Sequence, residues 1–192
     1  MKTIDEPARS VEIALETDVL VVGSGPGGLA AALSAARAGA RTALVDRNGC
    51  FGGNITQVGV EGFAWYRHSG TVDCEGIGIE FESRAKAMGA AMPEPQSLSH
   101  ALDAEMFKWV ADVLVPYRAL VPRNVGNLLV AGRCIGGDSV SHASARNMMC
   151  CAVSGQGAGV AAAISLQRNE PLDRLNIAAV HKELARQGAR FQ

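Results

Sequence analysis

The first quarter of the chain alternates between apolar runs and a helical pattern. Residues 18–22 (DVLVV) form a nearly continuous apolar run, which is typical of a strand buried on both faces of a parallel sheet. Residues 29–38 are rich in alanine and predict a helix that ends at Gly39. Residues 41–45 (RTALV) predict a second strand, closed by Asp46. The pattern therefore predicts a strand–turn–helix–strand unit.

The rest of the chain predicts further helices and two more strands. The expected strands are a short one at residues 11–15, where Val11, Ile13 and Leu15 alternate with other residues, and a buried one at 127–131 (NLLVA). The expected helices cover residues 77–88, 103–114, 143–166 and 172–187. Residues 1–10 are expected to be a mobile tail, and residues 47–75 to be irregular. We expect one α/β domain over residues 1–192.

Composition narrows the classes of function. A net charge of −1 gives no support for nucleic acid or an anionic membrane as a partner. The five cysteines contain no CxxC pair, so neither a metal site nor a disulfide framework is expected. The first ten residues lack an apolar core, which favours a cytoplasmic protein over a secreted one. Residues 148–166 are almost uncharged, but their many small residues favour a closely packed buried helix over a membrane span.

The motif GSGPGG at residues 23–28 carries the strongest chemical signal, because it follows the first strand and opens the first helix. Gly23 would make the tight turn, Gly25 would let the backbone approach a pyrophosphate, and Gly28 would let helix and strand pack closely. The helix, with Pro26 in its first turn, would offer free N–H groups to the phosphates. The alternative is a plain glycine-rich turn in an α/β sheet.

An acid lies at the end of the second predicted strand. Asp46 would accept hydrogen bonds from a ribose 2′-hydroxyl, and its carboxylate disfavours the 2′-phosphate of NADP despite the neighbouring Arg47. Gly52 and Gly53 follow within seven residues, before Asn54, and would let the loop fold back over the dinucleotide. Flavoproteins of the two-dinucleotide-binding type commonly show such a pair, although a plain loop is the alternative. The pattern favours FAD over NAD.

The later part of the chain resembles the closing segment of the FAD-dependent oxidoreductase family, which is related to the fumarate reductase and glutathione reductase folds. Residues 17–60 resemble the start of the same family. The matching positions of the closing segment, within residues 116–166, are Pro116, Tyr117, Arg118, residues 127–135, His142, Arg146, Met148, Cys151, Gly155, Gln156 and Gly159. The resemblance implies a Rossmann-like FAD-binding domain with a central parallel sheet.

The resemblance also implies where a flavin would lie. The loop from Gly132 through Arg133 and Cys134 would lie at the ribityl chain and the isoalloxazine ring. Gly155 would either approach the cofactor or, as we favour, allow close helix packing. Family members are longer and carry a substrate domain between the two matched segments. Here the predicted helix at residues 103–114 leads straight to Pro116, so that we expect the substrate domain to be absent.

Few residues are candidates for catalysis. His142 would be near the flavin as a general acid or base, or would have a structural or helix-capping role. Tyr117 and Arg118 would orient a substrate carboxylate or the flavin, or would serve in packing and a surface ion pair. The sequence supports an FAD-dependent oxidoreductase that acts as a homo-oligomer or as a subunit of a larger enzyme. The alternatives are a flavin-binding or electron-carrying module without a substrate, a remnant that binds nothing, and an NAD-binding protein.

Overall fold

Two parallel strands and one helix form the unit that the glycine motif opens. The computed structural model describes residue 4 and residues 7–60, 67–68, 71–72, 75–90 and 115–190. Strand β1 (Val19–Val22) leads into helix α1 (Pro26–Arg37), which returns the chain to β2 (Thr42–Val45). The strands pair in parallel, from Val19 opposite Thr42 to Val22 opposite Val45. This part of the α/β architecture is as predicted, and Gly39 ends the helical segment with a φ of 93°.

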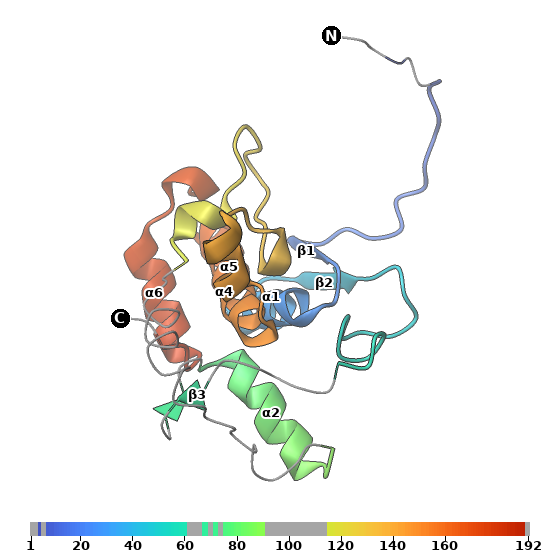
Figure 1. Ribbon diagram of the computed structural model, residues 1–192. Coiled ribbons are helices and arrows are strands. Elements are labelled where there is room, and N and C mark those ends of the chain that lie inside the picture. Colours follow the sequence, from blue (N-terminus) through green and yellow to red (C-terminus); the bar gives the residue numbers. More distant parts are fainter. Residues whose placement is uncertain are drawn as a thin grey trace.

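Helix α5 (Met148–Arg168) packs directly on α1 and forms the centre of the molecule (Figure 1). The two helix backbones touch at glycines. A Cβ atom built on Gly155 would lie 2.0 Å from the carbonyl oxygen of Gly27, and one on Gly159 would lie 2.1 Å from that of Ala31. No residue with a side chain fits at either position. The helix is long and apolar enough to cross a membrane, but 61% of its most apolar window is buried inside the fold, as expected of a core helix.

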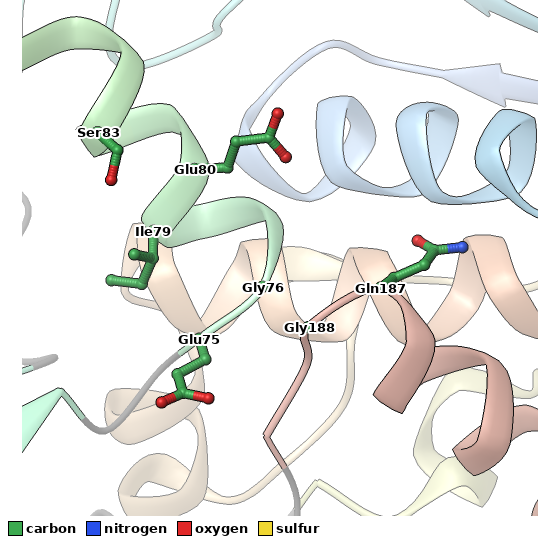
Figure 2. A pocket seen from close by; sticks show the side chains of 7 residues that line it. All are labelled: Glu75, Gly76, Ile79, Glu80, Ser83, Gln187 and Gly188. Carbon is green, nitrogen blue, oxygen red and sulfur yellow. The ribbon is translucent and has the colours of Figure 1, made fainter. Parts of the chain in front are cut away.

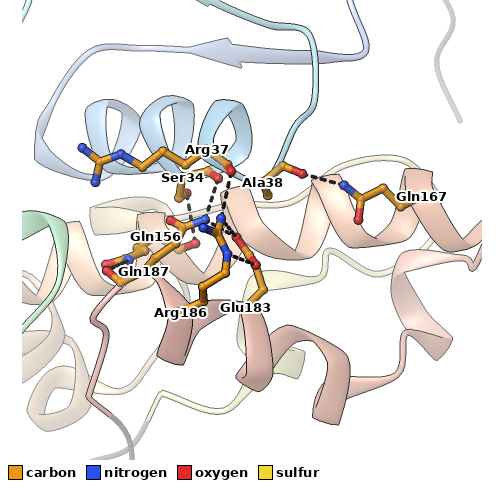
Figure 3. A network of polar contacts seen from close by, with 8 residues as sticks. All are labelled: Ser34, Arg37, Ala38, Gln156, Gln167, Glu183, Arg186 and Gln187. Atoms are coloured by element: carbon orange, nitrogen blue, oxygen red, sulfur yellow. Dashed lines mark hydrogen bonds and ion pairs between the residues drawn. The ribbon is translucent and has the colours of Figure 1, made fainter.

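Side chains from α5 and from helix α6 (Ile177–Arg186) bind the carbonyl end of α1 (Figure 3). Gln187 donates to the carbonyl oxygen of Ser34 at 3.1 Å, Arg186 to that of Arg37 at 3.0 Å, and Gln167 to that of Ala38 at 2.5 Å. The last carbonyls of a helix have no partner within the helix. Arg186 and Gln167 satisfy the carbonyl oxygens of Arg37 and Ala38, and Gln187 adds a second bond to that of Ser34, which also accepts from the N–H of Ala38. The C-terminal part of the chain thus holds the end of α1 in place.

Helix α2 (Ile77–Ala87) is attached at both ends of its first turn. The buried side chain of Gln156 accepts a hydrogen bond from the N–H of Ile77 at 3.1 Å. Arg37 of α1 makes two parallel hydrogen bonds to Glu80, at 2.7 and 2.9 Å, and Arg84 adds a third. The Arg37 guanidinium is the main cause that lowers the pKa of Glu80 from 4.5 to about 2. The pair thus ties α2 to α1 while Glu80 is ionised.

We expect this pair to make stability depend on pH. Because the folded state lowers the pKa of Glu80, its contribution is complete above about pH 4.5 and is lost as the pH falls towards 2. Both side chains are about a third exposed, so we expect about 1 kcal/mol from the pair. Glu80→Gln should lower the free energy of unfolding by that amount at pH 7 and by much less at pH 2, where about half of the Glu80 side chains are protonated. Glu75→Gln, an exposed carboxylate without an ion pair among the described residues, is the control. An equal effect of Glu80→Gln at both pH values would contradict the assignment.

The remaining elements surround α5 and are short. Helix α4 precedes α5, and η1 and η2 flank the segment 121–131. A two-residue antiparallel pair, β3 with β4, lies between β2 and α2 in the sequence. Their bounds are β3 Arg67–His68, β4 Thr71–Val72, η1 Tyr117–Leu120, η2 Gly132–Cys134, α4 Ser139–Ala145 and η3 Leu172–Arg174.

Four sequence-based expectations are wrong, and three of them concern strands. Residues 127–131 form no strand, and Leu128 is 46% exposed. β1 is covered on one face only, because Leu20 and Val22 are 56% and 78% exposed. Among the described strands, β2 is the one partner of β1. A fully buried strand of a parallel sheet is covered on both faces and paired at both edges. Among the described residues, β1 is covered on one face and paired at one edge.

Another wrong expectation is the single helix at 143–166. Asn147 adopts an extended conformation (φ −63°, ψ 150°), which ends α4 and lets α5 begin at Met148. Residues 11–15 form no strand either; they are extended and exposed. The helix at 77–88 is confirmed, and the predicted C-terminal helix is observed as η3 and α6. The helix predicted at 103–114 lies outside the described residues.

Candidate functional site

A cavity of about 760 Å³ opens between the start of α1, strand β1 and the segment 126–134. Its volume is within the range of small-molecule and cofactor sites. It brings together most of the residues that the sequence assigned to a dinucleotide. These are Gly23, Gly25, Pro26, Gly28, Gly53, Asn54, Gly132, Arg133 and Cys134.

The glycine turn has the shape that a phosphate-binding turn needs. A Cβ atom on Gly28 would lie 1.8 Å from the carbonyl oxygen of Gly23, so only glycine allows the turn to close against the helix. A Cβ atom on Gly25 would meet nothing within 4 Å and would project into open space. Helix α1 starts at Pro26 with no side-chain cap and no acid in its first turn. Its first N–H groups and its positive dipole end are therefore available to an anion.

Asp46 fixes the turn from the side. Its Oδ2 atom accepts hydrogen bonds from the N–H of Ser24 at 2.7 Å and from its hydroxyl at 2.6 Å, and its Oδ1 atom accepts two from Asn48. The hydroxyl of Ser24 and these other donors hold the pKa of Asp46 well below its usual range. Asp46 and Arg47 are not among the residues that line the cavity. In this arrangement, Asp46 positions the turn, and a ribose hydroxyl would compete with Ser24 or Asn48 for the carboxylate.

The loop after Asp46 folds back onto the turn. The N–H of Gly52 donates to the carbonyl oxygen of Ser24 at 2.9 Å. Gly52 and Gly53 have φ values of 119° and 58°, and a Cβ atom on Gly53 would lie 2.9 Å from the Cα atom of Gly25. Both glycines are required by backbone conformation or close contact, as is usual where two backbones meet. Gly53 and Asn54 reach the cavity, whereas Gly52 supports them from outside its lining.

The wall of the cavity next to the glycine turn is built on α5. Gly132 has a φ of 69°, and its N–H donates to the buried hydroxyl of Ser154 at 3.0 Å. This bond places η2 beside the glycine turn, where a Cβ atom on Gly27 would lie 3.2 Å from the Cα atom of Gly132. Burial is the main cause that raises the pKa of Cys151 to about 11, so this cavity-lining thiol stays protonated. Gly155 lies in the α1–α5 contact, which is the packing role favoured by its sequence.

The sequence pattern of the FAD dependent oxidoreductase family matches residues 18–115 and 100–184 of this chain. Together these stretches include all the residues that line the cavity. The chain belongs to the FAD-dependent oxidoreductase family. Its cofactor is FAD.

Several curated relatives share short stretches with the chain. The sarcosine oxidase alpha subunit of Corynebacterium sp. (strain U-96) is 46% identical over 57 residues, which are 30% of this chain and 6% of that protein. The soluble pyridine nucleotide transhydrogenase of Ectopseudomonas mendocina (strain ymp) is 48% identical over 52 residues, or 27% of this chain and 11% of that protein. The chain thus spans about a tenth or less of the length of these relatives. No solved structure matches it.

The lining of the cavity fits FAD. Gly25 leaves open space beside the uncapped start of α1, which suits a pyrophosphate. The exposed Arg133 lines the cavity together with Cys134 and Met148 at the start of α5. Residues 132–134 and the first turn of α5 would therefore hold the flavin end of the cofactor. Ser24 and Gly27 were missed as parts of this site, although their places inside the glycine motif could have indicated them.

The three candidate catalytic residues of this flavoprotein do not line the cavity. The hydroxyl of Tyr117 donates to the carbonyl oxygen of Leu172 at 2.9 Å, and burial raises its pKa to about 12. Tyr117 therefore joins η1 to η3 in a packing role. Arg118 is exposed. His142 lies within α4, where its backbone N–H donates to the carbonyl oxygen of Asp138 and its carbonyl oxygen accepts from the backbone N–H of Arg146. The structure brings the predicted cofactor residues together and leaves these three apart from them.

A second hollow, of about 480 Å³, lies between the start of α2 and the end of α6 (Figure 2). Two carboxylates, Glu75 and Glu80, line it, and Glu80 already binds Arg37. None of the cofactor residues reaches it. Among the described residues no group of His, Cys, Asp and Glu side chains could hold a metal ion. This hollow is therefore separate from the cavity that the predicted cofactor residues line.

Proposed function

We propose that the chain binds FAD non-covalently in the cavity between α1 and α5 and acts in the cytoplasm as an oxidoreductase, as an oligomer or as a subunit of a larger enzyme. The chain would lack the substrate domain that the family carries between its two FAD-binding segments. Its substrate site would then lie at an interface with another chain. The alternative is a flavin-binding or electron-carrying module that has no substrate of its own.

One observation carries the proposal. The cavity joins the glycine turn, at residues 23–28, to the segment 132–134 and the start of α5, although more than a hundred residues separate them in the sequence. A dinucleotide needs a phosphate site and a second site for its ring system. The chain provides the first through the start of α1 and the second through η2 and α5.

When bound, FAD supplies hydride or electron transfer at the N5 atom of its ring. The residues of the chain bind and orient it. The first turn of α5 begins without a side-chain cap and with no acid, so its N–H groups would favour negative charge on the nearby ring. Cys151 remains a neutral thiol there. The chain thus contributes binding and electrostatics at the cavity.

A specific observation supports the alternative module. The described residues that line the cavity include no histidine and no glutamate, and their one aspartate, Asp18, already binds Arg41 at 2.7 Å. An acid–base catalyst has to be within hydrogen-bond reach of the proton that it transfers. This chain would therefore need a partner to supply an acid–base group, or it would transfer electrons without acid–base catalysis. The relatives, named as an oxidase subunit and a transhydrogenase, share less than a third of this chain, so we take neither reaction from them.

The absorption spectrum of the purified chain, before and after denaturation, tests FAD binding. We expect about one FAD per chain, released into the supernatant on unfolding. If the chain is purified without flavin, added FAD at 100 times its dissociation constant should stabilise it by about 2.7 kcal/mol. A colourless protein that takes up no FAD and gains no thermal stability would contradict the proposal. Reduction by dithionite but by no metabolite, with or without partner chains, would favour the module.

A further inference from the structure

The open edge of β1 faces the cavity at the end away from the glycine turn. The N–H groups of Val19 and Gly23 donate to β2-side carbonyl oxygens of Arg41 and Val45, at 3.0 and 2.8 Å. Because backbone groups alternate between the two sides of a strand, those of Leu20 and Val22 point to the opposite side. Residues 18–22 and 126–131 both line the cavity, so these groups face residues 126–131 across it. Among the described residues, neither segment has a ladder partner within this space.

The floor of this part of the cavity is made of small and apolar side chains. Ala31 of α1 and Ala158, Ala162 and Leu166 of α5 line it. The floor thus resembles the helix layer beneath a parallel sheet, without a strand above it. An extended segment with apolar side chains on one face would fill the space and pair with β1.

The chain itself contains such a segment. Residues 10–17 (SVEIALET), which we call the arm, immediately precede β1 and run away from the body of the molecule (Figure 1). Val11, Ile13 and Leu15 are 73%, 75% and 57% exposed. They occupy alternate positions, so that they share one face of an extended arm, while Glu12 and Glu16 share the other. At about 3.3 Å per residue, residues 11–15 match the length of residues 127–131.

We propose that the arm of a second copy of this chain fills the space between β1 and residues 126–131 and completes the sheet. Val11, Ile13 and Leu15 lie on the floor of small residues, and Glu12 and Glu16 face solvent. The exchange is reciprocal: each copy gives its arm and receives one, which closes a dimer with two-fold symmetry. The proposal goes beyond FAD binding, since it names the partner and the residues that form one wall of the cofactor cavity.

The arm is less suited to its own cavity. To fold back beside β1 it would need a tight hairpin around Glu16 and Thr17, where two-residue loops favour glycine or asparagine. The hydroxyl of Thr17 also donates to the carbonyl oxygen of Arg41 at 2.6 Å, which directs the chain along β1 and not back across it. A straight arm from another copy needs no such turn.

Sedimentation equilibrium of the full chain tests the exchange. We expect a dimer at micromolar concentration and a dissociation constant raised on the order of 100-fold or more by Ile13→Asp, since each dimer buries two copies of this side chain. Ile4→Asp, at a position that is 92% exposed and outside the arm, is the matched control and should leave the dimer unchanged. A peptide of residues 10–17 should bind the Ile13→Asp variant, whereas a scrambled peptide should not.

Three results would overturn the exchange. A wild-type monomer at tens of micromolar would do so, including one whose own arm fills the cavity. A dimer that Ile13→Asp leaves intact would show that another surface pairs. A dimer weakened equally by Ile4→Asp would show a non-specific effect of charge. The mass is measured with and without added FAD. A dimer that takes up no FAD would contradict the proposed function but would still support the exchange.

Discussion

Replacing Gly159 by alanine is expected to lower the free energy of unfolding by about 2–4 kcal/mol. The new methyl carbon would lie 2.1 Å from the carbonyl oxygen of Ala31 and 2.2 Å from the hydroxyl of Ser34. The first of these atoms is backbone, so α1 and α5 would have to separate. The side chain of Ser34 would also have to move, which would break the hydrogen bonds that its hydroxyl donates to the carbonyl oxygens of Ala31 and Gln156. Gly155→Ala should act in the same way through Gly27.

Gly157→Ala is the matched control, because it changes the same helix by the same atom. The Cβ atom at position 157 would have the Cδ1 atom of Leu120 as its nearest neighbour, at 3.9 Å, which is an ordinary contact. Alanine is favoured over glycine inside a helix, so this variant should be neutral or more stable by up to about 1 kcal/mol. Urea unfolding followed by circular dichroism measures all three variants. Equal effects at 157 and 159 would refute the proposed backbone contact.

The difference between these glycines could be predicted in part from the sequence. Positions 155 and 159 are four residues apart and share one face of a helix, whereas 157 lies on the opposite side. The many small residues of 148–166 indicated close packing and a buried helix, which the structure has. The sequence did not identify α1 as the neighbour, because that pairing joins segments more than a hundred residues apart.

The absence of a strand at residues 127–131 could not be predicted from the sequence pattern alone. These residues have the apolar, branched composition of a buried strand, but a strand exists only through its neighbours. In the described part of the chain, the position beside them holds a cavity. Leu20 and Val22 are exposed for a related reason, since a face of a sheet is buried only where another element packs on it. The sequence pattern describes a sheet that one copy of the chain leaves incomplete.

The site shows a similar division. Residues 23–28 could be predicted as a phosphate-binding turn from the sequence, because each glycine is needed locally for a tight turn or a close backbone contact. The interaction of Asp46 with Ser24 was not predicted, since it depends on how the end of β2 lies beside the turn. Tyr117 was a candidate because of its place in a motif, and its actual partner, the carbonyl oxygen of Leu172, is set by the packing of the C-terminal segment.

Gly25→Ala should reduce FAD affinity on the order of 100-fold, or about 2.7 kcal/mol, while the chain stays folded. The backbone at Gly25 (φ −62°, ψ 175°) suits alanine, and the new methyl group meets no protein atom within 4 Å. It would instead occupy the space beside the first turn of α1, where a pyrophosphate has to approach the backbone. Loss of a glycine at the helix start should cost the free protein no more than about 1 kcal/mol. Fluorescence titration with FAD measures the affinity, and urea unfolding without FAD measures the stability.

Two further variants separate a blocked site from a damaged turn. Gly28→Ala places its methyl carbon 1.8 Å from the carbonyl oxygen of Gly23, so it should lower both FAD affinity and the stability of the free protein. Gly49→Ala lies in the loop after β2, outside the cavity lining and with no atom within 4 Å, and should change neither. If Gly25→Ala bound FAD as tightly as Gly49→Ala, the pyrophosphate would not lie at the start of α1. If Gly25→Ala lost stability as Gly28→Ala does, the backbone at Gly25 would not suit alanine, and the loss of FAD affinity would reflect damage to the turn.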